Sequence, residues 1–328
     1  MADIKEILKE RILVLDGAMG TMIQRHNLME EDFRGDRFKD HPCSLKGNND
    51  LLSITRPDII KSIHAEYYAA GADIAETNSF GGTWVAQDDY ELASAVYDIN
   101  FQSAKIAKEV AEEFTKKELN KPRFVAGSMG PTTKLASMSP DVNDPGFRNI
   151  SFEELVDAFK EQAKGLIDGG ADLLLVETIT DTLNAKAALF AIDEVQKEKG
   201  TDLPIMISGT ITDASGRTLS GQNTEAFVIS VEHSKPLSIG LNCALGADAL
   251  RPYLKIIKEK GNSLVSAHPN AGLPNEMGEY DESPEFMAQQ IKTFLDDGLV
   301  NIIGGCCGTT PEHIKAIAEL AAQYTPKA

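Results

Sequence analysis

Two adjacent cysteines, Cys306 and Cys307, lie in the segment "NIIGGCCGTTPEHI", and a third, Cys243, ends the segment "LSIGLNC". The cysteine pair and the single cysteine each follow a short apolar run of strand length. Three cysteine thiolates that meet in a fold suit zinc, which prefers tetrahedral coordination with sulfur and nitrogen ligands. Three protein ligands leave one coordination position open, and an open position is typical of catalytic rather than structural zinc sites.

The sequence around the cysteine pair favours thiolate chemistry. Gly304, Gly305 and Gly308 allow the backbone to turn neighbouring side chains towards one point. Thr310 then begins a helix, whose positive N-terminus is expected to lower the pKa of nearby thiols. Two other interpretations stay open: a strained disulfide between the adjacent cysteines, and, for Cys243, a buried thiol that acts as a small apolar side chain.

Two further residues are weaker candidates for metal ligation. Cys43 lies in a polar stretch after "HP" and is expected to be structural. His268 follows a strand-like run and could ligate zinc, but a single histidine in this place is more often a hydrogen-bonded core residue. The metal hypothesis therefore depends on Cys243, Cys306 and Cys307.

Composition restricts the class of protein. The chain has 328 residues, of which 42% are hydrophobic and 25% charged, as in a globular protein of one large domain or two ordinary ones. A net charge of −18 argues against nucleic acid or an anionic membrane as the partner. No run approaches the length of about 20 apolar residues that crosses a bilayer, and the N-terminus lacks the pattern of a secretory signal. With few cysteines, the sequence predicts a cytoplasmic protein.

Eight apolar runs of strand length recur along the chain, each followed by a polar cluster and a helical pattern. The runs are 12–17, 73–78, 123–128, 172–178, 204–210, 237–243, 263–270 and 300–306. The clearest helix begins at Ser151, which forms a capping box with Glu154. Eight βα units predict a single-domain α/β fold, a (β/α)8 TIM barrel over residues 1–328. A doubly wound open sheet is the alternative.

Polar side chains stand near the carboxyl ends of these runs, and in a barrel those ends converge on one mouth. They are Asp16, Glu76, Thr77, Asn78, Glu177, Thr178, Thr210, Asn242, Cys243, His268, Asn270, Cys306 and Cys307. A junction of Gly-Ala-Asp, strand and Glu-Thr occurs in both 69–78 and 168–178, which indicates a weak internal repeat. Long loops are expected at 24–50, 128–150 and 209–223, where loops of such length are usually functional or mobile.

One turn and one acid are suited to an amino acid. The turn "DGAMGT" (16–21) can present successive backbone N–H groups to a small carboxylate, and it lacks the spacing of a nucleotide-binding loop. Glu177 ends a very apolar run and could hold an ammonium group. A plain strand-to-helix turn and a capping role for Glu177 remain the alternatives. Together with a zinc site, these groups would hold an amino acid by both ends, with its thiol on the metal.

Eight segments carry a resemblance to a known family. They are "LVLDGAMGTMIQ", "KGNNDLL", "ETNSFGG", "DVNDPGFRNI", "PIMISGTITDASGRTLSGQ", "LNCALG", "AHPNAGLPNEMGEYD" and "GGCCGTTPEHI". The chain resembles, over essentially its whole length, the homocysteine-binding module of cobalamin-dependent methionine synthase, within the homocysteine S-methyltransferase family. The fold of that family is a (β/α)8 barrel.

The resemblance implies specific roles for residues of this chain. The implied zinc ligands are Cys243, Cys306 and Cys307. The sulfur of L-homocysteine would take the fourth position, which Asn270 can fill when substrate is absent. The amino-acid end of the substrate would be held by Asp16, Gly17, Ala18, Met19 and Glu177. Betaine-using relatives have a tyrosine after the acid, and Thr178 in this place disfavours that variant.

The resemblance also implies a donor and partners. Methylcobalamin would supply the methyl group that converts homocysteine to methionine, and other modules would regenerate it from methyltetrahydrofolate. The sequence contains neither a second barrel for a folate nor a corrinoid-ligating histidine motif. It is therefore expected to work with cobalamin-binding and folate-binding modules or with a separate corrinoid protein. The alternatives are a stand-alone enzyme with a sulfonium donor such as S-methylmethionine, a homocysteine-binding module inactive without its partners, and a structural zinc protein.

Overall fold

The computed structural model describes residues 3–212 and 215–327, and over these residues it forms a barrel of parallel strands. The strand order is β1-β8-β7-β6-β5-β4-β3-β2, and a bridge between Leu15 and Ile74 joins β1 to β2. The strands are β1 (Leu13–Val14), β2 (Ile74–Glu76), β3 (Phe124–Met129), β4 (Leu173–Ile179), β5 (Ile205–Gly209), β6 (Ser238–Gly246), β7 (Leu264–Asn270) and β8 (Ile302–Ile303). Each predicted run overlaps one of these strands, and β3, β4 and β6 extend beyond the carboxyl ends of their runs. The (β/α)8 barrel is confirmed, and the open sheet is excluded.

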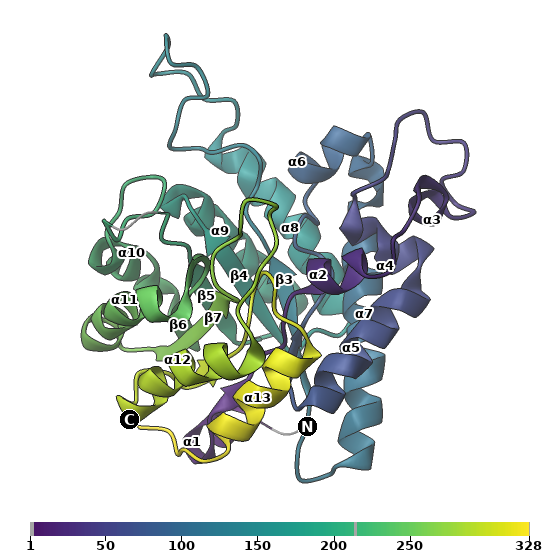
Figure 1. Cartoon of the computed structure of the whole chain (residues 1–328). Coiled ribbons are helices and arrows are strands. Elements are labelled where there is room, and N and C mark those ends of the chain that lie inside the picture. Colours follow the sequence, from purple (N-terminus) through teal and green to yellow (C-terminus); the bar gives the residue numbers. More distant parts are fainter. Residues whose placement is uncertain (1–2, 213–214, 328) are drawn as a thin grey trace.

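Helices surround the strands on the outside (Figure 1). The longer helices are α5 (Pro57–Ala70), α7 (Val96–Lys117), α8 (Phe152–Asp168), α9 (Thr182–Lys199), α10 (Thr224–Val231), α11 (Ala247–Lys260), α12 (Pro284–Asp296) and α13 (Pro311–Ala321). Shorter ones are α1 (Ile4–Glu10), α2 (Met19–Gln24), α3 (Glu30–Arg34), α4 (Leu52–Thr55), α6 (Trp84–Gln87), η1 (Asn49–Leu51), η2 (Asp88–Tyr90), η3 (Ala93–Ala95) and η4 (Glu232–Ser234). The predicted capping box of Ser151 and Glu154 begins α8. None of the helices in the described part of the chain is long and apolar enough to span a membrane.

The inside of the barrel is apolar at its amino-terminal end. Alternate strand residues point inwards, and Leu13, Phe124 and Leu173 form one buried cluster there with Ile4 and Leu8 of α1. Helix α1 therefore closes this end of the barrel. The neighbouring strand residues face the surrounding helices and belong to a second, larger cluster. With the amino-terminal end filled, polar groups in the barrel can gather only near the carboxyl ends of the strands.

The Gly-Ala-Asp repeat performs the same task each time it occurs. A glycine in the left-handed conformation ends the helix, and a side chain two or three residues after it accepts the N–H of a neighbouring strand. The glycines before the first and second acceptors are Gly71 (φ 114°) and Gly170 (φ 99°). The acceptors and their donors are Asp73 with Val14 (2.9 Å), Asp172 with Val125 (2.9 Å) and Asn301 with Val265 (3.0 Å). The third case has "GLVN" instead of "GAD", so the sequence pattern revealed only two.

The strands that carry the predicted site residues are irregular. β1 and β8 are shorter than the predicted runs because the chain leaves the sheet at Asp16 and after Ile303. The pairing of β4 with β5 shifts between Val176 and Ile179, and that of β6 with β7 shifts between Asn242 and Gly246. The loop before α8, within the predicted 128–150 loop, projects from the barrel (Figure 1). The predicted 24–50 loop contains α3, and two residues of the 209–223 loop lie outside the described residues.

Candidate functional site

The structure brings together the three cysteines that the sequence analysis singled out. Cys243 lies in the irregular part of β6, and Cys306 and Cys307 lie between β8 and α13. Their sulfur atoms all lie within 4.8 Å of one another, and the Cys243 and Cys307 sulfurs are 4.0 Å apart. Zinc–sulfur bonds of about 2.3 Å in a tetrahedron separate the sulfurs by about 3.8 Å. The three thiols therefore fit a tetrahedral metal ion.

Backbone hydrogen bonds fix the cysteine loop between β7 and β1. The Cys306 N–H donates to Pro269 O (2.8 Å), and the Cys307 N–H donates to Asn270 Oδ1 (3.1 Å). On the other side, the Gly305 N–H donates to Asp16 O (3.1 Å). Within the loop, Gly308 has φ 79°, and a Cβ there would lie 2.3 Å from Tyr280 Cβ. Only glycine meets both requirements, so this glycine is needed for the left-handed turn and for close packing.

The three thiols share their protons unequally. Hydrogen bonds from the Cys243 and Cys306 thiols lower the pKa of Cys307, with a further contribution from the Tyr280 hydroxyl. Hydrogen bonding to Cys243 and Cys307 raises the pKa of Cys306. The sequence analysis predicted that the N-terminus of the following helix would lower the thiol pKa values. In the structure the lowered pKa of Cys307 comes first from its sulfur neighbours, with smaller contributions from Tyr280 and from its own backbone N–H. The effect of the helix N-terminus stays a prediction.

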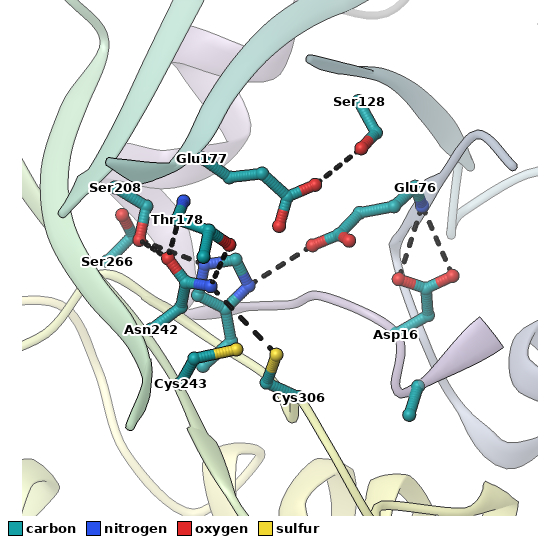
Figure 2. Close-up of polar contacts among 12 residues, drawn as sticks. Asp16, Glu76, Ser128, Glu177, Thr178, Ser208, Asn242, Cys243, Ser266 and Cys306 are labelled. Carbon is teal, nitrogen blue, oxygen red and sulfur yellow. Dashed lines mark hydrogen bonds and ion pairs between the residues drawn. The ribbon is translucent and has the colours of Figure 1, made fainter. Parts of the chain in front are cut away.

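Carboxylates from two other strands face the same space as the sulfurs (Figure 2). Glu177 comes from the irregular part of β4 and accepts a hydrogen bond from the Ser128 hydroxyl. Glu76 ends β2, and its Oε1 lies 3.1 Å from Nδ1 of His268. Oxygen and nitrogen atoms of Glu76, Glu177 and His268 lie within 4.8 Å of one another. The mouth of the barrel thus holds two clusters of side chains. We call Cys243, Cys306 and Cys307 the sulfur group. We call the cluster of Glu76, Glu177 and His268 the carboxylate group.

Burial determines the protonation of this carboxylate group. Burial raises the pKa of Glu76 to about 8, and burial together with the charge of Glu76 raises the pKa of Glu177 to about 8. Burial lowers the pKa of His268 to about 4. The Nε2 of His268 lies 3.0 Å from the Ser208 hydroxyl, so both ring nitrogens have partners other than sulfur. This agrees with the reading of His268 as a hydrogen-bonded core residue.

The turn 16–19 is more engaged with the protein than a free anion-binding nest would be. Both carboxylate oxygens of Asp16 accept the Glu76 N–H, at 3.2 and 3.1 Å, and burial raises the pKa of Asp16 well above its usual range. The Ala18 N–H donates to the Thr309 hydroxyl (3.1 Å), and a Cβ on Gly17 would lie 2.7 Å from that oxygen. Met19 begins α2 with no side-chain cap. The turn therefore positions Glu76 and the cysteine loop, and offers a substrate the uncapped start of α2.

The hydrogen bonds of the remaining two candidates, Asn270 and Cys43, indicate whether each could bind a metal. Asn270 ends β7, buried beside Cys307, and its Oδ1 accepts the Cys307 N–H. Since an amide oxygen has two lone pairs, this contact leaves one for a metal ligand bond. Cys43 is separate from the sulfur group: its thiol donates to Tyr90 O at 3.2 Å.

Sequence reasoning placed Glu76 and Asn242 at the mouth without giving them a role, and it passed over Tyr280. The repeat could have identified Glu76, because its Glu-Thr pair at 76–77 matches the pair that contains Glu177. Tyr280 lies in a long segment of low hydrophobicity, where nothing in its spacing indicates contact with Cys307. Its role depends on how the 271–283 loop folds back over the cysteines.

The raised pKa of Glu177 predicts a pH-dependent effect of Glu177→Gln on stability. Between pH 5 and pH 8 the unfolded chain loses this proton while the folded protein keeps it, so folding becomes less favourable as pH rises. Glutamine does not ionise, so Glu177→Gln removes this loss of stability at high pH. In metal-free protein without ligand, we expect Glu177→Gln to gain roughly 1–3 kcal/mol in free energy of unfolding, relative to wild type, between pH 5 and pH 8. Urea unfolding measures this, with exposed Glu10→Gln as control; an equal effect at both pH values would contradict the assignment.

Comparison with known proteins agrees with the fold. The homocysteine S-methyltransferase family model matches residues 13–321. The metallated form of the homocysteine methyltransferase MmuM from Escherichia coli is 23% identical, with a TM-score of 0.71 over 96% of this chain and 98% of that chain. The oxidized form gives 23% identity and a TM-score of 0.70 over 94% and 95% of the two chains. At this identity the solved structures show a shared fold, and the family match covers nearly all of the sequence. The chain belongs to the homocysteine S-methyltransferase family.

Proposed function

We propose that this protein transfers a methyl group to the thiol of L-homocysteine to form L-methionine, with zinc held by Cys243, Cys306 and Cys307. The observation that carries the proposal is the meeting of three thiols opposite a carboxylate group at one barrel mouth. Membership of the homocysteine S-methyltransferase family supports the same substrate. The MmuM structure with a bound metal belongs to a relative with the same fold, which supports a metal in this chain as well.

The sulfur group would activate the substrate thiol. Zinc in this site would bind the homocysteine sulfur as a thiolate at neutral pH and so supply the nucleophile. The new S–C bond to the methyl carbon would form as the bond between that carbon and the donor breaks. Cys307 already favours the ionised form in the free protein, because the other thiols hydrogen-bond to it. Asn270 would hold the Cys307 backbone and occupy the open position when substrate is absent.

The carboxylate group would bind the amino-acid end of the substrate. The charge of Glu76 raises the cost of ionising Glu177, and burial keeps His268 neutral. Within the described part of the chain, Glu76 has His268 as its ion-pair partner and neither acid is paired with a lysine or an arginine. A substrate ammonium would compensate their charge and allow Glu177 to ionise. The substrate carboxylate would lie at the turn 16–19, next to the uncapped N–H groups of α2. Homocysteine is an amino acid that can place an ammonium and a thiol at these two groups together.

The second part of the proposal is the identity of the methyl donor. The eight resembling segments favour methylcobalamin, brought by cobalamin-binding modules or by a separate corrinoid protein, with folate-binding modules for its regeneration. The alternative is a stand-alone enzyme with a sulfonium donor such as S-methylmethionine. A cytoplasmic location is consistent with four free cysteines, since a reducing compartment keeps thiols available for a metal.

Replacement of one thiol tests the metal site. Because Cys306 is one of the three proposed sulfur ligands and contacts both other thiols, Cys306→Ser should lose zinc and activity. The fold should persist, since the barrel core at the amino-terminal end does not involve the cysteines. Zinc content by mass spectrometry and circular dichroism measure the two properties. The matched control is Cys43→Ser, which should keep its zinc; full zinc retention by Cys306→Ser would contradict the ligand assignment.

Removal of one carboxylate charge tests the ammonium site. Glu177→Gln keeps the shape of the side chain and its contact with Ser128 but removes the charge that would pair with the substrate. We expect homocysteine to bind about 10–100-fold more weakly, the value of a charge-assisted hydrogen bond. Zinc content should not change. Calorimetric titration of the zinc-loaded proteins measures the affinity, and an unaltered affinity for homocysteine would remove Glu177 from the substrate site.

A direct comparison of donors tests the methyl source. Purified zinc-loaded protein is incubated with homocysteine and either methylcobalamin or S-methylmethionine, and methionine is quantified. We expect methionine from methylcobalamin. Turnover with S-methylmethionine alone would establish the sulfonium alternative, and the absence of turnover with either, despite homocysteine binding, would identify a binding module that needs partner modules.

A further inference from the structure

Two strained backbone positions lie at the mouth of the barrel, one in each half of the site. Thr178 follows Glu177 in the irregular part of β4 and has φ 54°, and Cys243 in the irregular part of β6 has φ 57°. A non-glycine residue in this conformation is strained and persists only where the surrounding structure holds it. Positive φ is most unfavourable for a β-branched residue such as Thr178. Some contact must therefore hold Thr178 in place.

The side chain of Asn242 supplies that contact. Asn242 is fully buried, and its Oδ1 accepts the Thr178 N–H at 3.1 Å and the Ser208 hydroxyl at 2.7 Å. Its Nδ2 donates to the Thr178 hydroxyl oxygen at 2.8 Å and faces the Cys306 sulfur at 3.9 Å. These four contacts use both lone pairs and both N–H groups of the amide. Asn242 thus extends from β6 across β5 to β4 (Figure 2).

The partners fix the orientation of the amide. Oδ1 faces two donors, a backbone N–H and a hydroxyl that donates its proton, so a flipped amide would place N–H groups against donors. Because Ser208 donates to Asn242, it accepts from Nε2 of His268, whose Nδ1 faces Glu76. A continuous set of hydrogen bonds therefore joins Cys306 to Glu76 through Asn242, Ser208 and His268.

We propose that Asn242 is a positioning residue that sets the separation between the metal-binding thiols and the carboxylate for the substrate ammonium. It does so in two ways: it holds Thr178, and with it Glu177, in the left-handed turn, and it offers an N–H group to the Cys306 sulfur. The inference rests on the proposed function, because it assigns a length requirement to the substrate of that site. A fixed separation selects an amino-acid thiol of one chain length, so homocysteine should bind in preference to cysteine, which is one methylene shorter.

The test is Asn242→Asp, which keeps the shape of the side chain but replaces its N–H donors with an oxygen. The Thr178 hydroxyl can rotate and donate to that oxygen, but the N–H group that faces the Cys306 sulfur would be replaced by a negatively charged oxygen, which repels a thiolate. Residues that support metal ligands typically contribute 10–100-fold to metal affinity. We expect zinc affinity, measured by competition with a chromophoric chelator, to fall by about 10–100-fold. In zinc-saturated protein, the ratio of homocysteine to cysteine affinity should fall by about tenfold or more.

Asn301→Asp is the matched control. Asn301 is also buried, and it accepts the Val265 N–H with its Oδ1 at the opposite end of the barrel. An aspartate can accept the same bond, as Asp73 and Asp172 do in equivalent positions. This variant should match wild type within about twofold in zinc affinity and in the homocysteine-to-cysteine ratio. A merely structural effect of a buried asparagine would change stability but leave the affinity ratio unaltered.

The outcomes separate this inference from the function on which it rests. If wild type binds zinc and homocysteine and Asn242→Asp retains both affinities and the ratio, Asn242 has no positioning role. If wild type takes up no zinc, the proposed function itself is wrong. Should Asn242→Asp fail to fold, Thr178→Ala removes the acceptor of Nδ2 and leaves the amide in place. That variant should also lower the homocysteine-to-cysteine ratio, and an unchanged ratio would overturn the proposal.

Discussion

The burial of several acidic groups side by side at one rim of the barrel is the constraint on which the site depends. A closed parallel barrel brings the carboxyl ends of its strands together, and here those ends carry three thiols and the carboxyl groups of Asp16, Glu76 and Glu177. Burial raises the pKa of all three carboxyl groups, and hydrogen bonding raises that of Cys306. The free protein avoids burying several negative charges by keeping protons on these groups. Two cations, a metal at the sulfurs and an ammonium at the carboxylates, would compensate the charge in the loaded protein.

The rest of the fold keeps this rim in place. Helix α1 and an apolar layer fill the amino-terminal end of the barrel, so the polar groups are confined to the other end. At that amino-terminal end, Asp73, Asp172 and Asn301 cap strand N–H groups and fix where the strands begin. At the carboxyl end, the cysteine loop is fixed between β7 and the turn after β1. Regular structure thus supports two irregular strands, β4 and β6, that aim Glu177 and Cys243 at the same space.

Much of the fold could be predicted from the sequence because the signals were local. Eight apolar runs indicated eight strands, and Ser151 with Glu154 marked the start of α8. The three cysteines could be grouped since they follow strands that end at the same rim. The bulge at Thr178 could not be predicted, because it depends on the amide of Asn242 from another strand rather than on local preference. For the same reason the contact of Tyr280 with Cys307 and the inward role of Asp16 were not evident.

The central claim is that three thiolates of this rim hold a zinc ion whose fourth position accepts the substrate sulfur. Zinc K-edge X-ray absorption of the zinc-loaded protein, with and without L-homocysteine, measures the number of sulfur ligands directly. The account predicts three sulfur ligands and one lighter ligand in the free protein, and four sulfur ligands after homocysteine is added. A sulfur count that homocysteine leaves unchanged, or a metal bound by fewer than three sulfurs, would contradict it.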